Sequence, residues 1–194
     1  AMINLVKEKI KLEGREKPIE NFKIISDYKS YSDEISGYLD ELKKEVVYAV
    51  LGEFKNDLIH HLTEENNKEF ELLEAETDSE QFGKKASKIL FRPNSWNEDY
   101  FIGLSFDKEL YDLFYGIYYR KNNASIQLSG DLTKIFPDNK SDETWPLGLY
   151  IYEKGKIDYD LLVREIESGY LLKKIASGFN EVINKTKKIH PISE

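Results

Sequence analysis

Nine aromatic side chains lie within 26 residues of this chain, in the stretch WNEDYFIGLSFDKELYDLFYGIYYRK at positions 96–121. The large apolar residues alternate along two parts of it. One alternating set is Tyr100, Ile102, Leu104 and Phe106, and the other is Leu113, Tyr115, Ile117 and Tyr119. A period of two is typical of a β-strand, and aromatic and β-branched residues favour pleated sheets. The stretch therefore predicts two strands, near 99–106 and 112–120, that share a buried face.

Three further segments, 69–75, 86–91 and 147–152, have a similar composition and are also predicted to be strands. The connections between strands are short, which favours an antiparallel meander because parallel strands need long crossovers. Alternation places about half of the rings on a buried face and leaves the other half facing helices or solvent. Two interpretations of the rings stay open: a hydrophobic core, which we favour because each buried ring contributes a few kcal/mol, and an exposed binding platform.

A long helix is predicted from Ser32 to about Thr63, because apolar residues recur there at steps of three or four. Ser32 is the expected N-cap, with Asp33 and Glu34 in the first turn. The predicted apolar stripe consists of Ile35, Leu39, Leu42, Val46, Val50, Phe54, Leu58 and Leu62. Such a helix spans roughly 45 Å, enough to cross a domain or to join two parts. A separate helical piece is expected after Pro18.

Two more helices are expected to close the chain. The first is capped by Asp158 and ends at Gly169, and the second contains an apolar stripe from Leu172 to Ile189. Together, these elements predict an α+β fold: an antiparallel sheet of about four to five strands packed by helices, with one long flanking helix. The expected organisation is a helical N-terminal segment, 1–66, and an α+β domain, 67–194, forming one compact unit.

The net charge is −8, which disfavours nucleic-acid binding because that binding depends on neutralising phosphates. A local basic face is conceivable in the tail, although lysines near helix C-termini are commonly just solvated. These lysines are Lys173, Lys174, Lys185, Lys187 and Lys188. No apolar run approaches the roughly 18 residues of a membrane span, and no signal peptide is evident. The absence of cysteine excludes disulfides. We therefore expect a cytoplasmic protein with no membrane association.

Few residues suggest a reaction. His60 and His61 have acids or amides four residues away on either side, a spacing that metal-binding helical bundles use. Those bundles need equivalent ligands on partner helices, and no ExxH motif is present, so we favour a polar helix end. The triplet Glu53-Phe54-Lys55 matches part of a two-metal nuclease motif but falls in the predicted helix. We expect no catalytic residues, no metal and no cofactor, and an unrecognised hydrolase stays a third interpretation.

Several landmarks follow one another in a recognisable order. They are FRPNSW at 91–96, DYFIGLSFD at 99–107, LFYGIYYRK at 113–121, ETWPLGLYIY at 143–152 and an IESG turn at 166–169. This series resembles the region that follows the nuclease core in a bacterial PD-(D/E)XK nuclease-like superfamily, which includes proteins similar to restriction and defence nucleases. The resemblance covers roughly residues 32–189. The catalytic carboxylates and lysine of that superfamily lie upstream, and this chain has no counterpart, so no catalytic residue carries over.

The resemblance implies a non-catalytic accessory or recognition domain that contacts nucleic acid or a nuclease core. The candidate binding residues are Arg92, Trp96, Tyr100, Arg120 and Trp145. In this hypothesis Trp96 and Trp145 open a groove at one end of the sheet, and the two arginines supply its charge.

A structural interpretation stands beside the binding hypothesis: Gly116 lets a neighbouring strand approach, Pro146 starts an edge strand, and both tryptophans brace the sheet. An alternative function of another class is a small acidic protein-interaction module, either an inhibitor or a scaffold, with no role in nucleic-acid binding. The sequence leaves the oligomeric state open.

Overall fold

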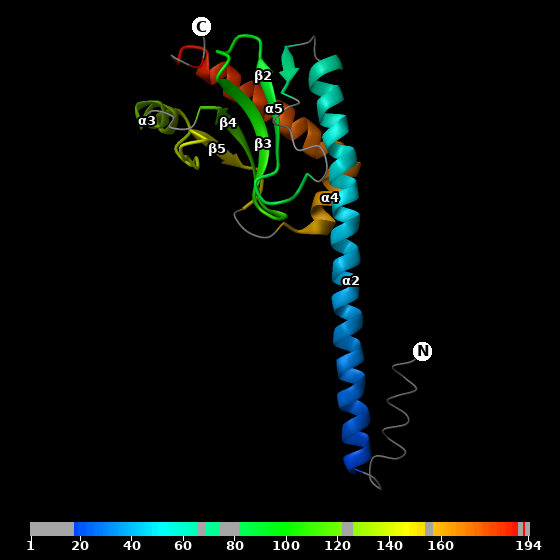
Figure 1. The fold of residues 1–194 in the computed structure, drawn as a ribbon. Coiled ribbons are helices and arrows are strands. Elements are labelled where there is room, and N and C mark those ends of the chain that lie inside the picture. The colour runs from blue at the N-terminus through cyan, green and yellow to red at the C-terminus, as the bar shows by residue number, and fades with distance from the viewer. Residues whose placement is uncertain are drawn as a thin grey trace. The chain divides into compact units, whose positions relative to one another are not determined.

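The computed structural model describes residues 18–65, 69–73, 82–121, 126–153, 157–189 and 192. In these ranges the chain has the α+β fold that the sequence predicts, a five-stranded antiparallel sheet with helices (Figure 1). The chain divides into two compact units, Ala1–Val46 and Val47–Glu194, and a single long helix contributes residues to both. The sheet and the other helices belong to the second unit.

The sheet is a meander with the strand order β1-β2-β3-β4-β5. Its strands are β1 (Phe70–Leu72), β2 (Lys88–Pro93), β3 (Tyr100–Lys108), β4 (Tyr111–Tyr119) and β5 (Leu147–Tyr150). Every neighbouring pair is antiparallel, and all five strands lie close to their predicted positions. The prediction of an antiparallel meander is confirmed. The connections from β2 to β3 and from β3 to β4 are short, as an antiparallel pair allows, whereas the connection from β4 to β5 contains helix α3 (Ile126–Ile135).

The long helix α2 (Pro18–His60) is confirmed, but its predicted start is wrong. The two expected helical pieces form one helix, so Ser32 lies inside it and is not an N-cap. No proline or glycine follows Pro18 before Gly37, and Pro18 occupies the first helical position, where proline is well tolerated. The helix ends in a π-helical turn, η1 (His61–Glu65), in which the Thr63 hydroxyl donates to the Ile59 carbonyl at 2.7 Å.

The buried stripe of α2 differs from the predicted one. The buried residues in the second unit are Val47, Leu51, Phe54, Leu58 and Leu62. Of the predicted stripe, Phe54, Leu58 and Leu62 are buried and Val50 is half-buried, whereas Ile35 and Val46 are exposed; the side chains of Leu39 and Leu42 lie outside the described residues. Repeated steps of four advance about 40° beyond a full turn each time, so the predicted set spreads over more than one face, whereas the observed spacing stays on one.

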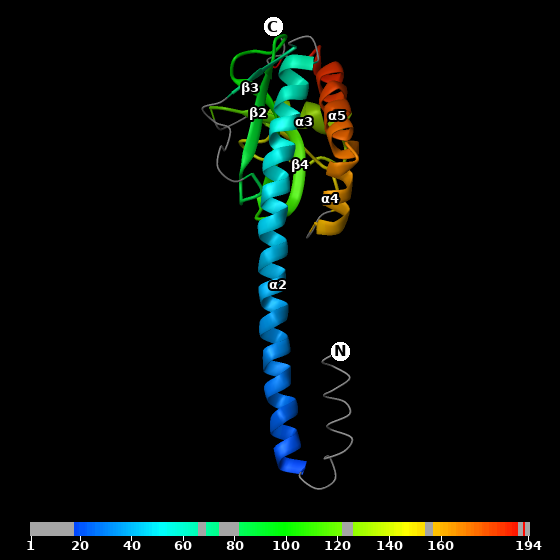
Figure 2. The same cartoon turned by 90° about the vertical axis from the view of Figure 1, so that its right-hand side faces the viewer.

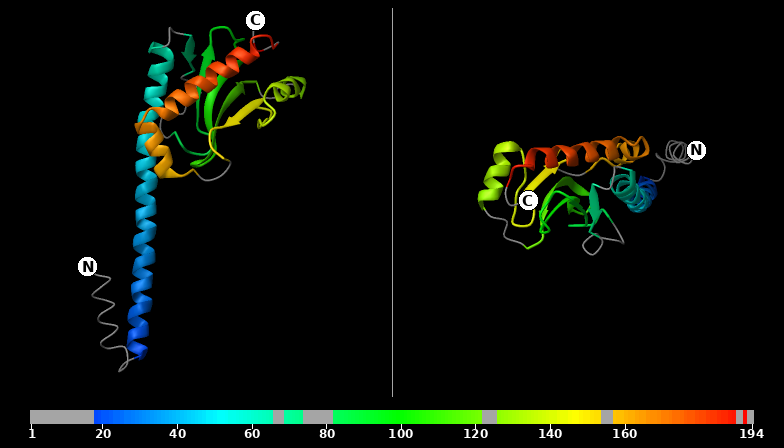
Figure 3. Two further views of the ribbon diagram at one scale, coloured as in Figure 1. Left: turned by 180° about the vertical axis from the view of Figure 1, so that it is seen from behind. Right: turned by 90° about the horizontal axis from the view of Figure 1, so that it is seen from above.

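The remaining described helices are α3 (Ile126–Ile135), α4 (Tyr159–Glu167) and α5 (Tyr170–Thr186). Asp158 is the N-cap of α4, as predicted, and Gly169 between α4 and α5 has a φ of 69°, which suits glycine. Figure 2 shows α4 and α5 following each other on the same side of the strands. The two views in Figure 3 show α5 lying across this face, where it contacts β4.

Both faces of the sheet carry buried hydrophobic side chains. The helix-side cluster, on the face that α5 covers, includes Ile102, Leu104, Phe106 and Ile117 of the sheet together with the buried residues of α2 and α5. The opposite cluster consists of Leu90, Phe101, Phe114, Tyr118 and Trp145. More rings are therefore buried than alternation alone predicted, and the core interpretation is confirmed for them.

Candidate binding sites

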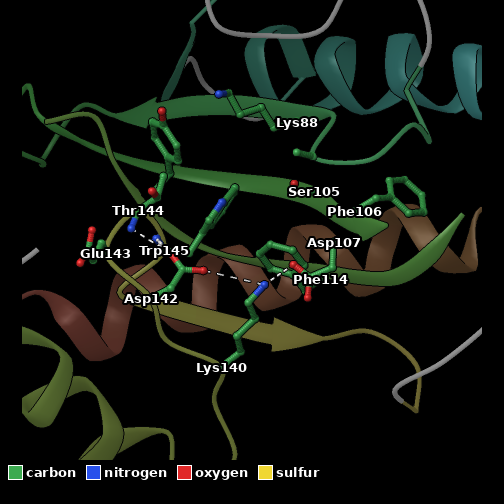
Figure 4. Close-up of a pocket in the computed structure, with 12 residues that line it drawn as sticks. Lys88, Ser105, Phe106, Asp107, Phe114, Lys140, Asp142, Glu143, Thr144 and Trp145 are labelled. Atoms are coloured by element: carbon green, nitrogen blue, oxygen red, sulfur yellow. Dashed lines mark hydrogen bonds and ion pairs between the residues drawn. The ribbon is translucent and has the colours of Figure 1, made fainter. Parts of the chain in front are cut away.

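A pocket of about 470 Å³ lies on the sheet face that carries the opposite cluster. Strands β2, β3 and β4 contribute Lys88, Asp107 and Tyr118, and the segment that leads into β5 contributes Lys140 and Trp145 (Figure 4). These residues are far apart in sequence. The meander brings them together because residues with the same alternation on neighbouring strands project from one face.

A row of three glycines shapes the sheet under Trp145. Gly103, Gly116 and Gly148 are directly paired across β3, β4 and β5. A Cβ atom on Gly103 would lie 3.1 Å from the Trp145 ring, and one on Gly116 would collide with the Leu147 carbonyl. The bare backbone therefore lets the indole pack against Phe114, with ring centroids 4.9 Å apart. The expectation that Gly116 admits a neighbouring strand is confirmed.

The charges in this pocket compensate one another. Lys140 forms an ion pair with Asp107, and its Nζ lies 3.9 Å from an Asp142 carboxylate oxygen and 4.6 Å from the centre of the Phe114 ring. The Tyr150 hydroxyl donates to Asp107 at 3.2 Å. Burial, together with the charge of Asp107, raises the pKa of Tyr150 to about 12, so this hydroxyl stays a neutral donor.

The wall of the pocket is held by a local turn. Asp142 Oδ1 accepts hydrogen bonds from the backbone N–H groups of Thr144 at 2.9 Å and of Trp145 at 2.7 Å. Glu143 also lines the pocket, which therefore has three acids (Asp107, Asp142 and Glu143) and two lysines (Lys88 and Lys140). An excess of acids does not suit a polyphosphate or a nucleic-acid backbone.

The predicted arginines do come together. Arg92 and Arg120 line a small pocket of about 90 Å³ on the same sheet face, with Glu71, Glu98 and Phe101. The Arg92 guanidinium pairs with Glu71, and the Arg120 guanidinium lies 5.0 Å from the centre of the Phe101 ring. Each arginine thus has an acid or a ring beside it.

The predicted tryptophans do not share a groove. Trp96 is 4% exposed and belongs to the helix-side cluster, whereas Trp145 is 7% exposed and belongs to the opposite cluster. Tyr100 is also buried, and its ring stacks on Tyr119 with a centroid distance of 4.8 Å. Burial first, then the neighbouring Tyr119 and Asp99, raise the pKa of Tyr100 to about 12. A direct role of these three residues in binding stays a prediction.

A larger groove of about 620 Å³ was not anticipated from the sequence. It runs between the turn after β2 and helix α5 and is lined by Asn94, Ser95, Asn180, Asn184 and Lys187. The only sequence signal was the spacing of Asn180 and Asn184, which places both amides on one face of a helix. The tail lysines do not gather into one basic face: Lys174 Nζ donates to the Ile151 carbonyl at 2.9 Å, and Lys185 pairs with Glu181 at 2.7 Å.

In the first unit, α2 has large apolar side chains in solvent. Tyr31 is 64% exposed, Ile35 60%, Tyr38 62% and Val46, at the end of the unit, 57%. At 3.6 residues per turn these four positions fall within about 80° of one another, so they form one stripe along the helix. We call these four residues the exposed stripe. The sequence placed Ile35 and Val46 in one apolar stripe, and both are exposed, because alignment on a helix shows that residues share a face but not what covers it.

No group of three or more His, Cys, Asp or Glu side chains is placed to hold a metal ion within the described ranges. His60 Nδ1 instead lies 2.9 Å from a carboxylate oxygen of Glu64, one turn along the helix. Among the helices that the structure describes, none combines the length and the apolar character of a membrane span. The chain matches no known family model, and neither a curated protein nor a solved structure is significantly similar to it.

Proposed function

We propose that this chain is a protein-recognition module, which binds a partner protein through the exposed stripe on α2. The observation that supports this proposal most directly is the exposure of Tyr31, Ile35, Tyr38 and Val46 along one line of the helix. Soluble proteins rarely leave aligned large apolar side chains in water unless they have an interaction to make. Covering each of them contributes roughly 1.5–3 kcal/mol, so the stripe can stabilise a complex substantially.

The electrostatics of the chain favour a protein over a nucleic acid as the partner. The net charge is −8, and the described lysines and arginines on the sheet face lie beside acids or rings. The rings that a nucleic-acid platform would use, such as Phe101, Phe114 and Tyr118, are buried. The resemblance to the region that follows a nuclease core supports an accessory role of the same kind, with a nuclease core as one such partner.

The proposal can be tested by photo-crosslinking in the cells that produce the protein. A photoreactive amino acid replaces Ile35 in the full chain, and in a matched control it replaces Tyr170, which is 54% exposed on α5 in the second unit. We expect a discrete protein adduct from position 35 and none of the same mass from position 170. Absence of an adduct at position 35, or an adduct that nuclease digestion removes, would contradict the proposal.

A second candidate function has one specific observation in its favour. Arg92 and Arg120 line one pocket, an arrangement that allows two guanidinium groups to contact neighbouring phosphates of a nucleic-acid backbone. Labelled single- and double-stranded DNA and RNA at low salt test this candidate. Binding that Arg92→Ala and Arg120→Ala weaken, and that Arg164→Ala on α4 leaves unchanged, would support it. No binding to any of the four nucleic acids would exclude it.

A further inference from the structure

The exposed stripe has an acidic border on one side. Glu34, Glu41 and Glu45 are all exposed, and at 3.6 residues per turn they form a line along one edge of the stripe. Asp33 and Asp40 fall on the opposite side of the helix, about half a turn away. The chain contains no lysine or arginine between Lys29 and Lys43, so this part of α2 is locally anionic.

A second copy of the chain does not complement this border. If Ile35 occupies an a position of a two-helix coiled coil, Tyr31 and Tyr38 occupy d, and Glu34 and Glu41 occupy g. An antiparallel pair would set the two glutamate rows against each other. A parallel pair would set Glu34 and Glu41 against positions 39 and 46, where the sequence has leucine and valine. Neither arrangement supplies an opposite charge, and two chains of charge −8 also repel each other.

We propose that the exposed stripe binds a basic amphipathic helix of a partner protein. Apolar side chains of that helix, spaced by three and four residues, cover Tyr31, Ile35 and Tyr38. Its lysines or arginines lie along the glutamate border and pair with Glu34, Glu41 and Glu45. This inference rests on the proposed function, because it names the chemistry of the partner at the same surface. Helix-in-groove and coiled-coil complexes are recognised in the same way: apolar anchor residues supply the affinity, and flanking charges select the partner.

The experiment measures binding of two designed peptides to the full chain by titration calorimetry. Both are helices of about three heptads with leucine at the core positions; one has lysine along the flanks and the other has glutamate. We expect the lysine peptide to bind about tenfold more tightly than the glutamate peptide at low salt, with the difference shrinking as salt rises. Ile35→Ser should weaken binding of the lysine peptide about tenfold or more.

Charge-neutral variants separate the border from the overall charge. Glu34→Gln combined with Glu41→Gln should weaken the lysine peptide several-fold and reduce its salt dependence. Asp33→Asn combined with Asp40→Asn removes the same charge from the opposite side of the same helix and should leave affinity within about twofold. Circular dichroism verifies that each variant keeps its helix content.

Several outcomes would overturn the inference. Equal affinity for both peptides, or equal losses from the glutamate and aspartate pairs, would remove the role of the border. Self-association that Ile35→Ser abolishes in sedimentation would identify a second copy as the occupant. A chain lacking residues 1–17 that binds the lysine peptide more than about tenfold better would identify the chain's own N-terminal segment instead. If neither peptide binds but the crosslinked adduct at position 35 forms, the proposed partner chemistry is wrong and the proposal of protein recognition stands. If neither peptide binds and no adduct forms, both proposals are wrong.

Discussion

At Gly116 the backbone of β5 approaches so closely that a methyl group would collide with the Leu147 carbonyl. We predict that Gly116→Ala lowers the free energy of unfolding by about 3 kcal/mol or more, because the strand pair has to separate to admit the added atom. Urea unfolding measures the change. Gly52→Ala is the control, since no atom lies within 4 Å of the added carbon and alanine favours a helix by about 0.5–1 kcal/mol. Equal effects of the two substitutions would contradict the close approach.

Tyr100 shows how a single buried hydroxyl affects stability in alkali. Its pKa is about 12 in the folded protein, whereas tyrosine in an unfolded chain ionises near pH 10. Between these values the unfolded state binds fewer protons, so stability is unchanged below about pH 10 and falls as the pH rises toward 12. We predict that Tyr100→Phe makes this fall shallower, as measured by urea unfolding at several pH values from 8 to 12. A variant with an unchanged slope would show that Tyr100 ionises normally.

Among the secondary-structure elements, α4 depends on a side-chain cap. Asp158 Oδ1 accepts from the N–H groups of Asp160 at 2.9 Å and Leu161 at 3.2 Å. We predict that Asp158→Ala lowers stability by about 1 kcal/mol, whereas Asp158→Asn keeps most of it because asparagine caps helices equally well. Thermal unfolding of the three proteins measures both effects. If the asparagine variant loses as much as the alanine variant, the cap contributes through charge and not through its hydrogen bonds.

The strands could be predicted from the sequence because their signal is local. Alternation along 100–106 and 113–119 specifies which residues share a face, and the observed helix-side cluster contains both sets. It was harder to predict which face of α2 is buried. Val46 and Val47 are both apolar, but only Val47 is buried, because it packs against residues that are distant in the sequence. Trp145 was missed as a partner of Phe114 because the glycine against which its ring packs, Gly103, lies on a different strand far away in the sequence.

For the molecule as a whole, the two units should differ in local stability. Leu51, Phe54 and Leu58 of α2 contribute to a hydrophobic core, whereas the described side chains from 31 to 38 are all exposed. Helices in water gain most of their stability from packing, so the first unit should open more often. We predict that hydrogen exchange of amides in residues 33–42 is at least about tenfold faster than in residues 51–60 of the same helix. Uniform protection along α2 would mean that something already covers the first unit.

The candidate sites were less predictable than the fold. Arg92 in β2 and Arg120 directly after β4 line one pocket, because the meander brings both to the same face of the sheet; their joint role in binding stays a prediction. The groove with Asn94, Asn180 and Asn184 joins a turn to a helix more than 80 residues later, and no local pattern encodes that meeting. Two members of the exposed stripe, Ile35 and Val46, were expected in an apolar stripe, whereas Tyr31 and Tyr38 were missed. Periodicity shows which side chains share a face but does not report whether that face is exposed.

The chain has only two tryptophans, and the sheet separates them: Trp96 lies on the side covered by α5 and Trp145 on the other. Each indole is therefore an intrinsic optical probe of one side. With Trp96→Phe the tryptophan emission comes only from the pocket wall, and with Trp145→Phe it comes only from the helix-packed interior. Quenching by iodide or a shift in emission wavelength when a partner is added can then be assigned to one side of the fold without attaching any dye.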